Sequence, residues 1–112
     1  MANQYKRFQA TELSASTDTT IADIPTATTA IVKSVIVSND HVSTTASVSM
    51  LVAPSGSGTL TVEPAKTIQP DSSEDLLSNK GPLVLESADI LKIKPSAGDI
   101  DVTVSALLVD RN

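Results

Sequence analysis

The stretch from Ile90 to Val109 constrains the fold of this chain more than any other. It reads ILKIKPSAGDIDVTVSALLV, in which strand-forming residues at 90–94 lead into a turn cluster at 95–99. Four apolar residues then follow at a spacing of two, with Asp101, Thr103 and Ser105 between them: Val102, Val104, Ala106 and Leu108. Two such runs around a Pro/Gly loop predict a β-hairpin. With residues 83–85 just before it, we predict a three-stranded meander at the end of the chain.

The rest of the chain reads as further short strands. Apolar runs separated by prolines and polar loops occur at 21–24, 31–38, 46–53, 59–62 and 66–69. In the second run Val35 and Val37 share a face with Ile31, while Val32 and Ile36 take the other face, which predicts a central strand. In the third run Val48, Met50 and Val52 point one way. Residues 74–78 have room for one helical turn, which Gly81 and Pro82 then stop.

This pattern predicts an all-β, single-domain antiparallel β-sandwich of about eight short strands. The strand order stays open between a jelly roll and an immunoglobulin-like sandwich. We expect residues 1–10 to be an N-terminal arm or edge strand and residues 11–112 to be the sandwich domain.

Composition indicates an aliphatic core that needs support. Hydrophobic residues make up 40% of the chain and charged residues 19%, which is typical of a globular protein. Aromatic residues make up 2%, and a core without large rings buries less area per residue. A small domain of this kind gains stability from subunit contacts, so we expect a homo-oligomer.

Charge and cysteine content exclude several classes of partner. The net charge is −5, whereas nucleic acid and anionic membranes both require clustered Lys and Arg. No apolar run is long enough for a membrane span, and the first eight residues lack a secretory h-region, so we expect no Sec export. There is no cysteine, which excludes disulfides and thiolate metal sites.

The polar candidates for chemistry each have an ordinary explanation. His41 is the single histidine, and we interpret it as an exposed turn residue rather than the base of a catalytic triad. The acidic residues at 71, 74 and 75 do not have the spacing of an EF-hand and are interpreted as a solvated loop. Asp99 and Asp101 flank a turn, where aspartate is common. Residues 54–58 contain two glycines without a phosphate-loop pattern and are expected to form a hairpin tip. We therefore expect no catalytic residues, no metal and no cofactor.

The first ten residues hold both aromatic side chains and an adjacent basic pair. They predict either a frayed terminus with one edge strand or an arm that docks on a neighbouring subunit. In the second case the interface residues are Tyr5, Lys6, Arg7 and Phe8, with the two aromatic side chains as anchors.

Two segments resemble small structural proteins of tailed bacteriophages. Residues 28–39, TTAIVKSVIVSN, are similar to a strand of the pattern a-I-V-k-s-I-x-V-x-N in that group. Residues 81–93, GPLVLESADILKI, are similar to its G-P-x-x-L-x-x-x-D-x-L hairpin, and an alternating final strand follows in both. The resemblance covers most of residues 28–109. It also extends to capsid decoration (cement) proteins, which share the cysteine-free, Ser/Thr-rich composition, and it implies self-association on a virion surface.

The expected function is therefore that of a non-enzymatic virion protein made in the host cytoplasm. We expect a homotrimer that stabilises the phage head by bridging subunits of the major capsid protein. A tail, neck or baseplate subunit is the nearest alternative. An adhesion or carbohydrate-binding module and a hydrolase that uses His41 are alternatives of other classes.

Overall fold

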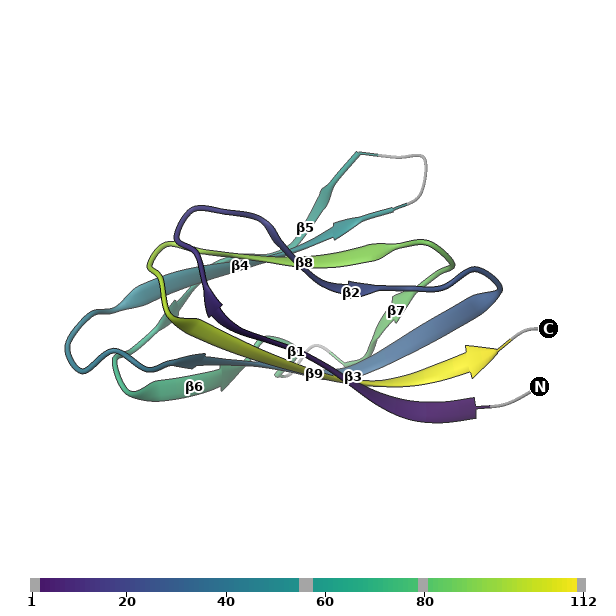
Figure 1. Cartoon of the computed structure of the whole chain (residues 1–112), viewed down its shortest axis with the longest axis horizontal. Helices are drawn as coiled ribbons and strands as arrows, with labels where there is room; N and C mark the ends of the chain where they lie inside the picture. The colour runs from purple at the N-terminus through teal and green to yellow at the C-terminus, as the bar shows by residue number, and fades with distance from the viewer. Residues whose placement is uncertain (1–2, 55–57, 79–80, 111–112) are drawn as a thin grey trace.

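The computed structural model describes residues 3–54, 58–78 and 81–110, and within these ranges it contains nine strands and no helix (Figure 1). The strands are β1 (Asn3–Leu13), β2 (Thr19–Asp23), β3 (Thr28–Asn39), β4 (Ala46–Ala53), β5 (Leu60–Ile68), β6 (Ser72–Asp75), β7 (Leu83–Leu85), β8 (Ile90–Pro95) and β9 (Ile100–Asp110). They form two antiparallel sheets packed face to face, so the predicted all-β sandwich is confirmed.

The strand order is that of a jelly roll. Sheet A has the order β1-β9-β3-β6, with β7 also paired to β3, and sheet B has the order β2-β8-β4-β5. Pairs β4–β5, β3–β6, β2–β8 and β1–β9 nest around the turn between β4 and β5. The chain is thus arranged as one long hairpin that has been rolled up, which separates the jelly roll from the immunoglobulin-like alternative.

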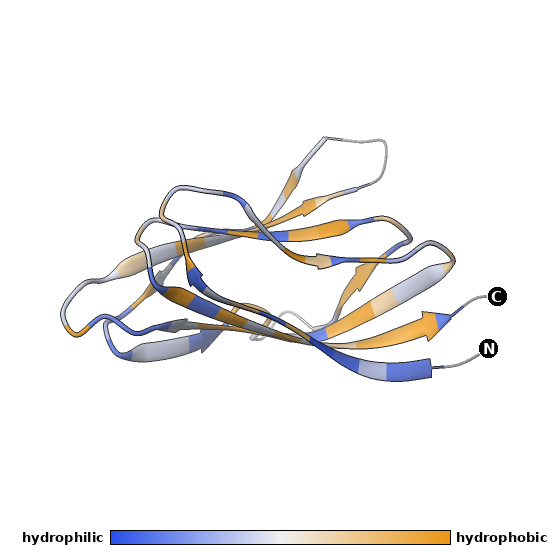
Figure 2. Ribbon diagram, in the orientation of Figure 1, coloured by the Kyte–Doolittle hydropathy of each residue, from blue (hydrophilic) through white to orange (hydrophobic). Residues whose placement is uncertain are grey.

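Alternation along the strands places an aliphatic core between the two sheets. The inward side chains of the central strands are all buried, whereas β1 is largely hydrophilic (Figure 2). The largest fully buried side chains are Ile24, Met50, Ile68, Leu76, Leu85, Leu91, Ile93 and Ile100. Phe8 is only partly buried against this cluster, so the core relies on aliphatic packing, as the composition predicts.

The predicted meander at the end of the chain is wrong. β7 and β9 both pair with β3 in sheet A, whereas β8 pairs with β2 and β4 in sheet B. The loop after β8 therefore carries the chain across the sandwich instead of closing a hairpin. Period-two alternation shows only that each strand buries one face, and strands on opposite sides of one core satisfy that pattern equally well.

Strand β3 is central, as predicted, but its two faces are divided differently. Its register shifts between Val32 and Ser34, where one extra residue forms a bulge. Because a bulge reverses the alternation, Val32 lies in the core together with Val35 and Val37. Ile31 therefore faces outward, opposite to its predicted grouping with Val35.

Two predictions at sheet edges also need correction. The predicted strands 59–62 and 66–69 belong to one strand, β5, which contains Pro64. β5 lies at the edge of sheet B and pairs only with β4. The nitrogen of Pro64, which has no hydrogen to donate, can therefore lie on the open side of the strand. The register with β4 shifts beside it. The predicted helical turn at 74–78 is wrong, because residues 72–75 form β6 and Leu76 and Leu77 turn into the core.

Candidate functional site

The most distinctive surface feature is a row of large apolar side chains on the outer face of sheet A. Tyr5 lies opposite Leu107, Leu107 opposite Ile31, and Ile31 opposite Val84. The row therefore crosses β1, β9, β3 and β7 at one level of the sheet. We call these four residues the apolar row.

The outward direction of the apolar row follows from its neighbours in the sequence. On β9, Ala106 and Leu108 are buried, so Leu107 between them faces away from sheet B. On β3, Ala30 and Val32 are likewise buried on either side of Ile31. The ends of the row are the most accessible: Tyr5 is 77% exposed and Val84 is 55% exposed.

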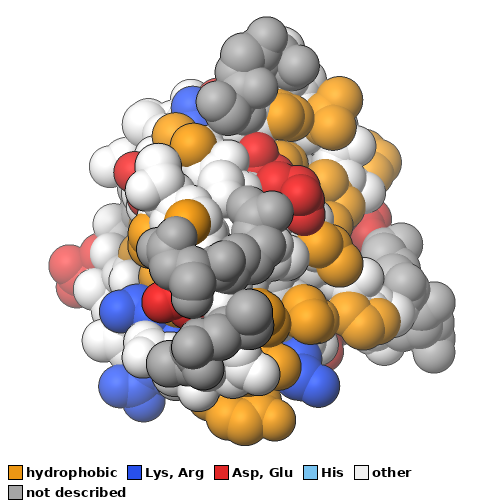
Figure 3. Space-filling model, turned by 90° about the vertical axis from the view of Figure 1, so that its right-hand side faces the viewer, with side chains coloured by type: hydrophobic (Ala, Val, Ile, Leu, Met, Phe, Trp, Pro, Cys, Tyr) orange, Lys and Arg blue, Asp and Glu red, His pale blue; other side chains and the backbone are white. Residues whose placement is uncertain are grey.

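Charged residues lie on both sides of the apolar row. On one side, Arg7 and Lys33 line a shallow hollow together with Tyr5 and Ser105. On the other side the next level contains Val109 opposite Thr29, and the exposed Glu86 follows directly after β7. Figure 3 shows hydrophobic side chains between basic ones along its lower edge, where sheet A lies. The outer face is therefore apolar in the middle, with Arg7 and Lys33 on one side of the row and a single acidic residue, Glu86, after β7 on the other.

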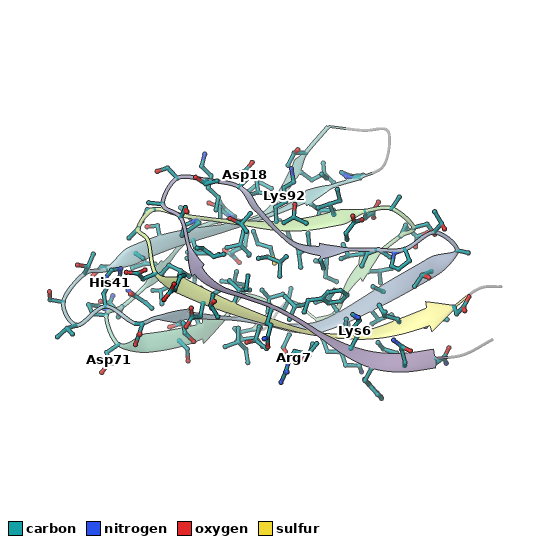
Figure 4. All side chains as sticks on the ribbon, in the orientation of Figure 1. Lys6, Arg7, Asp18, His41, Asp71 and Lys92 are labelled. Carbon is teal, nitrogen blue, oxygen red and sulfur yellow. The ribbon has the colours of Figure 1, made fainter. Side chains whose placement is uncertain are left out.

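The structure distributes the four predicted interface residues over two faces of β1. Tyr5 and Arg7 belong to the outer face, and Figure 4 shows Arg7 pointing away from the sandwich. Phe8 points to the opposite face and packs against the core, with Lys6 Nζ 5.6 Å from the centre of its ring. Because strand side chains alternate, one flat partner meets Tyr5 and Arg7 but not Phe8.

His41 lies at the loop end of the sandwich in a mainly acidic hollow. The hollow is lined by Thr11, Glu12, Asp40, His41, Asp99 and Asp101. The ring is half-buried rather than exposed, and its Nε2 lies 2.7 Å from the carbonyl oxygen of Gly98. The backbone N–H of His41 donates to Asn39 Oδ1 at 3.1 Å. The described residues that line this hollow include no serine, the nucleophile of the triad that the hydrolase alternative requires.

The acidic candidates serve as local hydrogen-bond acceptors. Asp75 Oδ1 accepts from the N–H groups of Val35 and Leu77, at 3.1 and 3.0 Å. Asp101 Oδ1 accepts from the N–H group of Glu12 at 3.0 Å, and Asp71 and Asp99 occupy turns at positive φ. Within the described ranges, no three His, Cys, Asp or Glu side chains lie close enough to share a metal ion.

β4 and β5 form an antiparallel hairpin, which agrees with the turn predicted at 54–58, although residues 55–57 lie outside the described residues. In the part of the chain that the structure describes, no helix is long and apolar enough to cross a membrane.

Sequence reasoning missed three of the four residues of the apolar row. One signal was present at Leu107, where an apolar residue occupies the outward phase of β9 between Ala106 and Leu108. The outward phase of Ile31 was hidden by the bulge in β3. The alignment of Val84 with Ile31 depends on the pairing of β7 with β3, which local pattern does not reveal.

Comparison with known proteins gives the fold but no family. No family model matches the chain, and no curated protein matches it. A solved chain from "Bacillus endospore appendages form a novel family of disulfide-linked pili" is similar at a TM-score of 0.56 and 15% identity, over 99% of this chain and 88% of that one. A chain of the infectious bursal disease virus Gx strain is similar at a TM-score of 0.53 and 13% identity, over 98% of this chain and 34% of that one.

A pentameric capsid protein isolated from metagenomic phage sequences gives a TM-score of 0.42 at 22% identity, which is too low to support an argument. At these identities the two better matches establish a shared fold and nothing about activity. This chain spans about a third of the virus chain and most of the appendage chain. The jelly roll is thus found in a pilus subunit and in a virus particle.

Proposed function

We propose that this chain is a non-enzymatic structural protein of a tailed-phage virion, and that it decorates the head by binding across adjacent capsid subunits. The observation that carries the proposal is the apolar row. It places four large apolar side chains together on the outer sheet face, two of them exposed and two half-buried, in a molecule whose other aliphatic residues are mostly buried. An exposed apolar patch with a charged rim is typical of a protein–protein contact.

The polar residues also support a structural role, because they bond to backbone groups. His41 and Asp101 bond the backbone at the loop end of the sandwich, and Asp75 bonds the backbone of β3 and of Leu77, so these side chains stabilise the fold. The fold is also one used in two assemblies, a pilus and a virus particle. A decoration protein that binds only the assembled lattice stabilises that lattice by mass action, without a chemical step.

A filament or tail subunit is the second candidate, and one observation favours it. The similarity to the endospore appendage subunit covers 88% of that chain. Those pili are described as disulfide-linked, whereas this chain has no cysteine. A filament of this chain would therefore be held together by non-covalent contacts alone.

Add-back to particles that lack the chain tests the decoration proposal. Purified chain is expected to bind such heads at a fixed stoichiometry and to raise the temperature at which they release DNA. Tyr5→Ser is expected to reduce occupancy at least tenfold, because it removes the most exposed ring of the apolar row. Cosedimentation with the particles measures the occupancy.

Substitution of Tyr5 alone tests the contact more specifically than a Tyr5/Phe8 double substitution. Phe8 packs against the core, so replacing it would also change the stability of the fold. Val42→Ser is the control, since Val42 is 93% exposed in the loop between β3 and β4, eleven residues along the chain from Ile31 of the apolar row. Heads that bind neither wild type nor control would contradict a role on the head. Equal occupancy by all three proteins would remove Tyr5 from the contact.

A further inference from the structure

We propose that the partner of the apolar row is a second copy of this chain, packed face to face about a two-fold axis that runs along the row. The inference deepens the proposed function and rests on its claim that the row is a contact surface. It assigns that contact to the dimer, so the head is bound by the dimer through other surfaces, and Tyr5→Ser lowers head occupancy by weakening the dimer. It makes the unit of assembly a dimer of sandwiches joined through the outer faces of sheet A.

The position of the two-fold axis determines which residues of the two copies meet. A two-fold axis along the row places each of the four side chains opposite its own copy, so apolar atoms meet apolar atoms along the whole row. The same rotation exchanges the two sides of the row. The side that carries Arg7 and Lys33 then faces the partner's side that carries Glu86.

Charge complementarity selects this axis over the other simple choice. Lys33 is on β3, and Glu86 follows β7, which is the strand beside it. The rotation about the row therefore brings Lys33 close to Glu86 of the second copy. A two-fold axis parallel to the strands would instead place the basic side of each copy opposite the basic side of the other. It would bring Arg7 towards the second copy's Lys33, and this contact between like charges is unfavourable.

The size of the face is consistent with a dimer of modest affinity. Three strands of eleven or twelve residues are roughly 36 Å long and span about 14 Å, and β7 adds three residues beside them, which gives roughly 550 Å² of sheet per copy. A standard interface buries about 800 Å² per partner. Sheets also pack well on one another at a separation of about 10 Å, as the two sheets of one sandwich do. We therefore expect a dissociation constant on the order of micromolar.

Sedimentation equilibrium of the purified chain at about 50 mM salt, where ion pairs are weakly screened, tests the inference. Wild type is expected to be in monomer–dimer equilibrium. Val84→Lys is expected to weaken the dimer at least tenfold, because the axis places the two introduced ammonium groups face to face. Val42→Lys makes the same change of side chain and net charge in an exposed loop, and it is expected to dimerise like wild type.

A charge exchange tests the orientation. Lys33→Glu and Glu86→Lys are each expected to weaken the dimer by a few-fold, since each brings like charges together across the axis. The double variant K33E/E86K is expected to recover most of the loss. A monomeric or trimeric wild type, an unchanged Val84→Lys variant or a double variant no better than the singles would overturn the inference. A monomer that still occupies phage heads would leave the proposed function standing, so the two failures are distinguishable.

Discussion

Replacing Asn39 with alanine is expected to lower the free energy of unfolding by about 2–4 kcal/mol. Asn39 is 1% exposed at the end of β3, and its amide joins three segments. Its Nδ2 donates to the carbonyl oxygens of Thr44 and Ile68, at 2.8 and 3.1 Å, and its Oδ1 accepts from the N–H group of His41. The link to Ile68 crosses from sheet A to sheet B.

Alanine at this position would leave these three backbone groups without their partner; the bond to Ile68 is buried and the bonds to Thr44 and His41 are part-buried. Each buried polar group left without a hydrogen bond costs about 1–3 kcal/mol, so the total is large for one small side chain. Urea denaturation followed by circular dichroism measures the change. Asn3→Ala is the matched control, because Asn3 is exposed on β1 and its replacement is expected to change stability by less than about 0.5 kcal/mol. Equal effects at the two positions would refute the role assigned to the Asn39 amide.

Replacing Ile93 with alanine is expected to cost about 2–5 kcal/mol. Ile93 is fully buried on β8, beside Met50 of β4, in the middle of sheet B. The substitution removes three carbon atoms from an aliphatic core. No large ring lies near the centre of that core to move into the space. The cost therefore combines lost transfer free energy with a residual cavity.

Two variants separate burial from side-chain type. Ile36→Ala makes the same substitution on β3 at a residue that is 41% exposed, so its cost is expected to stay below about 1 kcal/mol. Ile93→Val removes one methylene group and is expected to cost about 0.5–1.5 kcal/mol. Thermal and urea unfolding of the three variants give the comparison. An Ile93→Ala cost no greater than that of Ile36→Ala would mean that the core does not lie where the structure places it.

The fold class was accessible from sequence because it depends on local period. The alternation of Val48, Met50 and Val52, and of Val102 and Val104, identifies inward residues that are all buried. Strand order was not accessible, because β7, β8 and β9 have similar local patterns although β8 belongs to the opposite sheet. Which sheet a strand joins depends on contacts with residues far away in the chain, which a local pattern does not contain.

The candidate site was accessible only in part. Tyr5 stood out from sequence because aromatic residues are so rare in this chain. Leu107 and Ile31 join it only through the register of β1, β9 and β3, and the bulge after Val32 determines which face of β3 Ile31 occupies. The hydrogen bond from His41 to the carbonyl of Gly98 also joins residues far apart in sequence, so the half-buried position of that ring was not predictable.

Immunogold electron microscopy of the parent phage, with an antibody against this chain, tests the central claim most directly. The account predicts label spread over the surface of the head, at regular density and absent from particles that lack the chain. Label confined to the neck or tail would favour the second candidate, a non-covalent filament or tail subunit. The absence of label from every part of the virion would contradict a structural role in the particle.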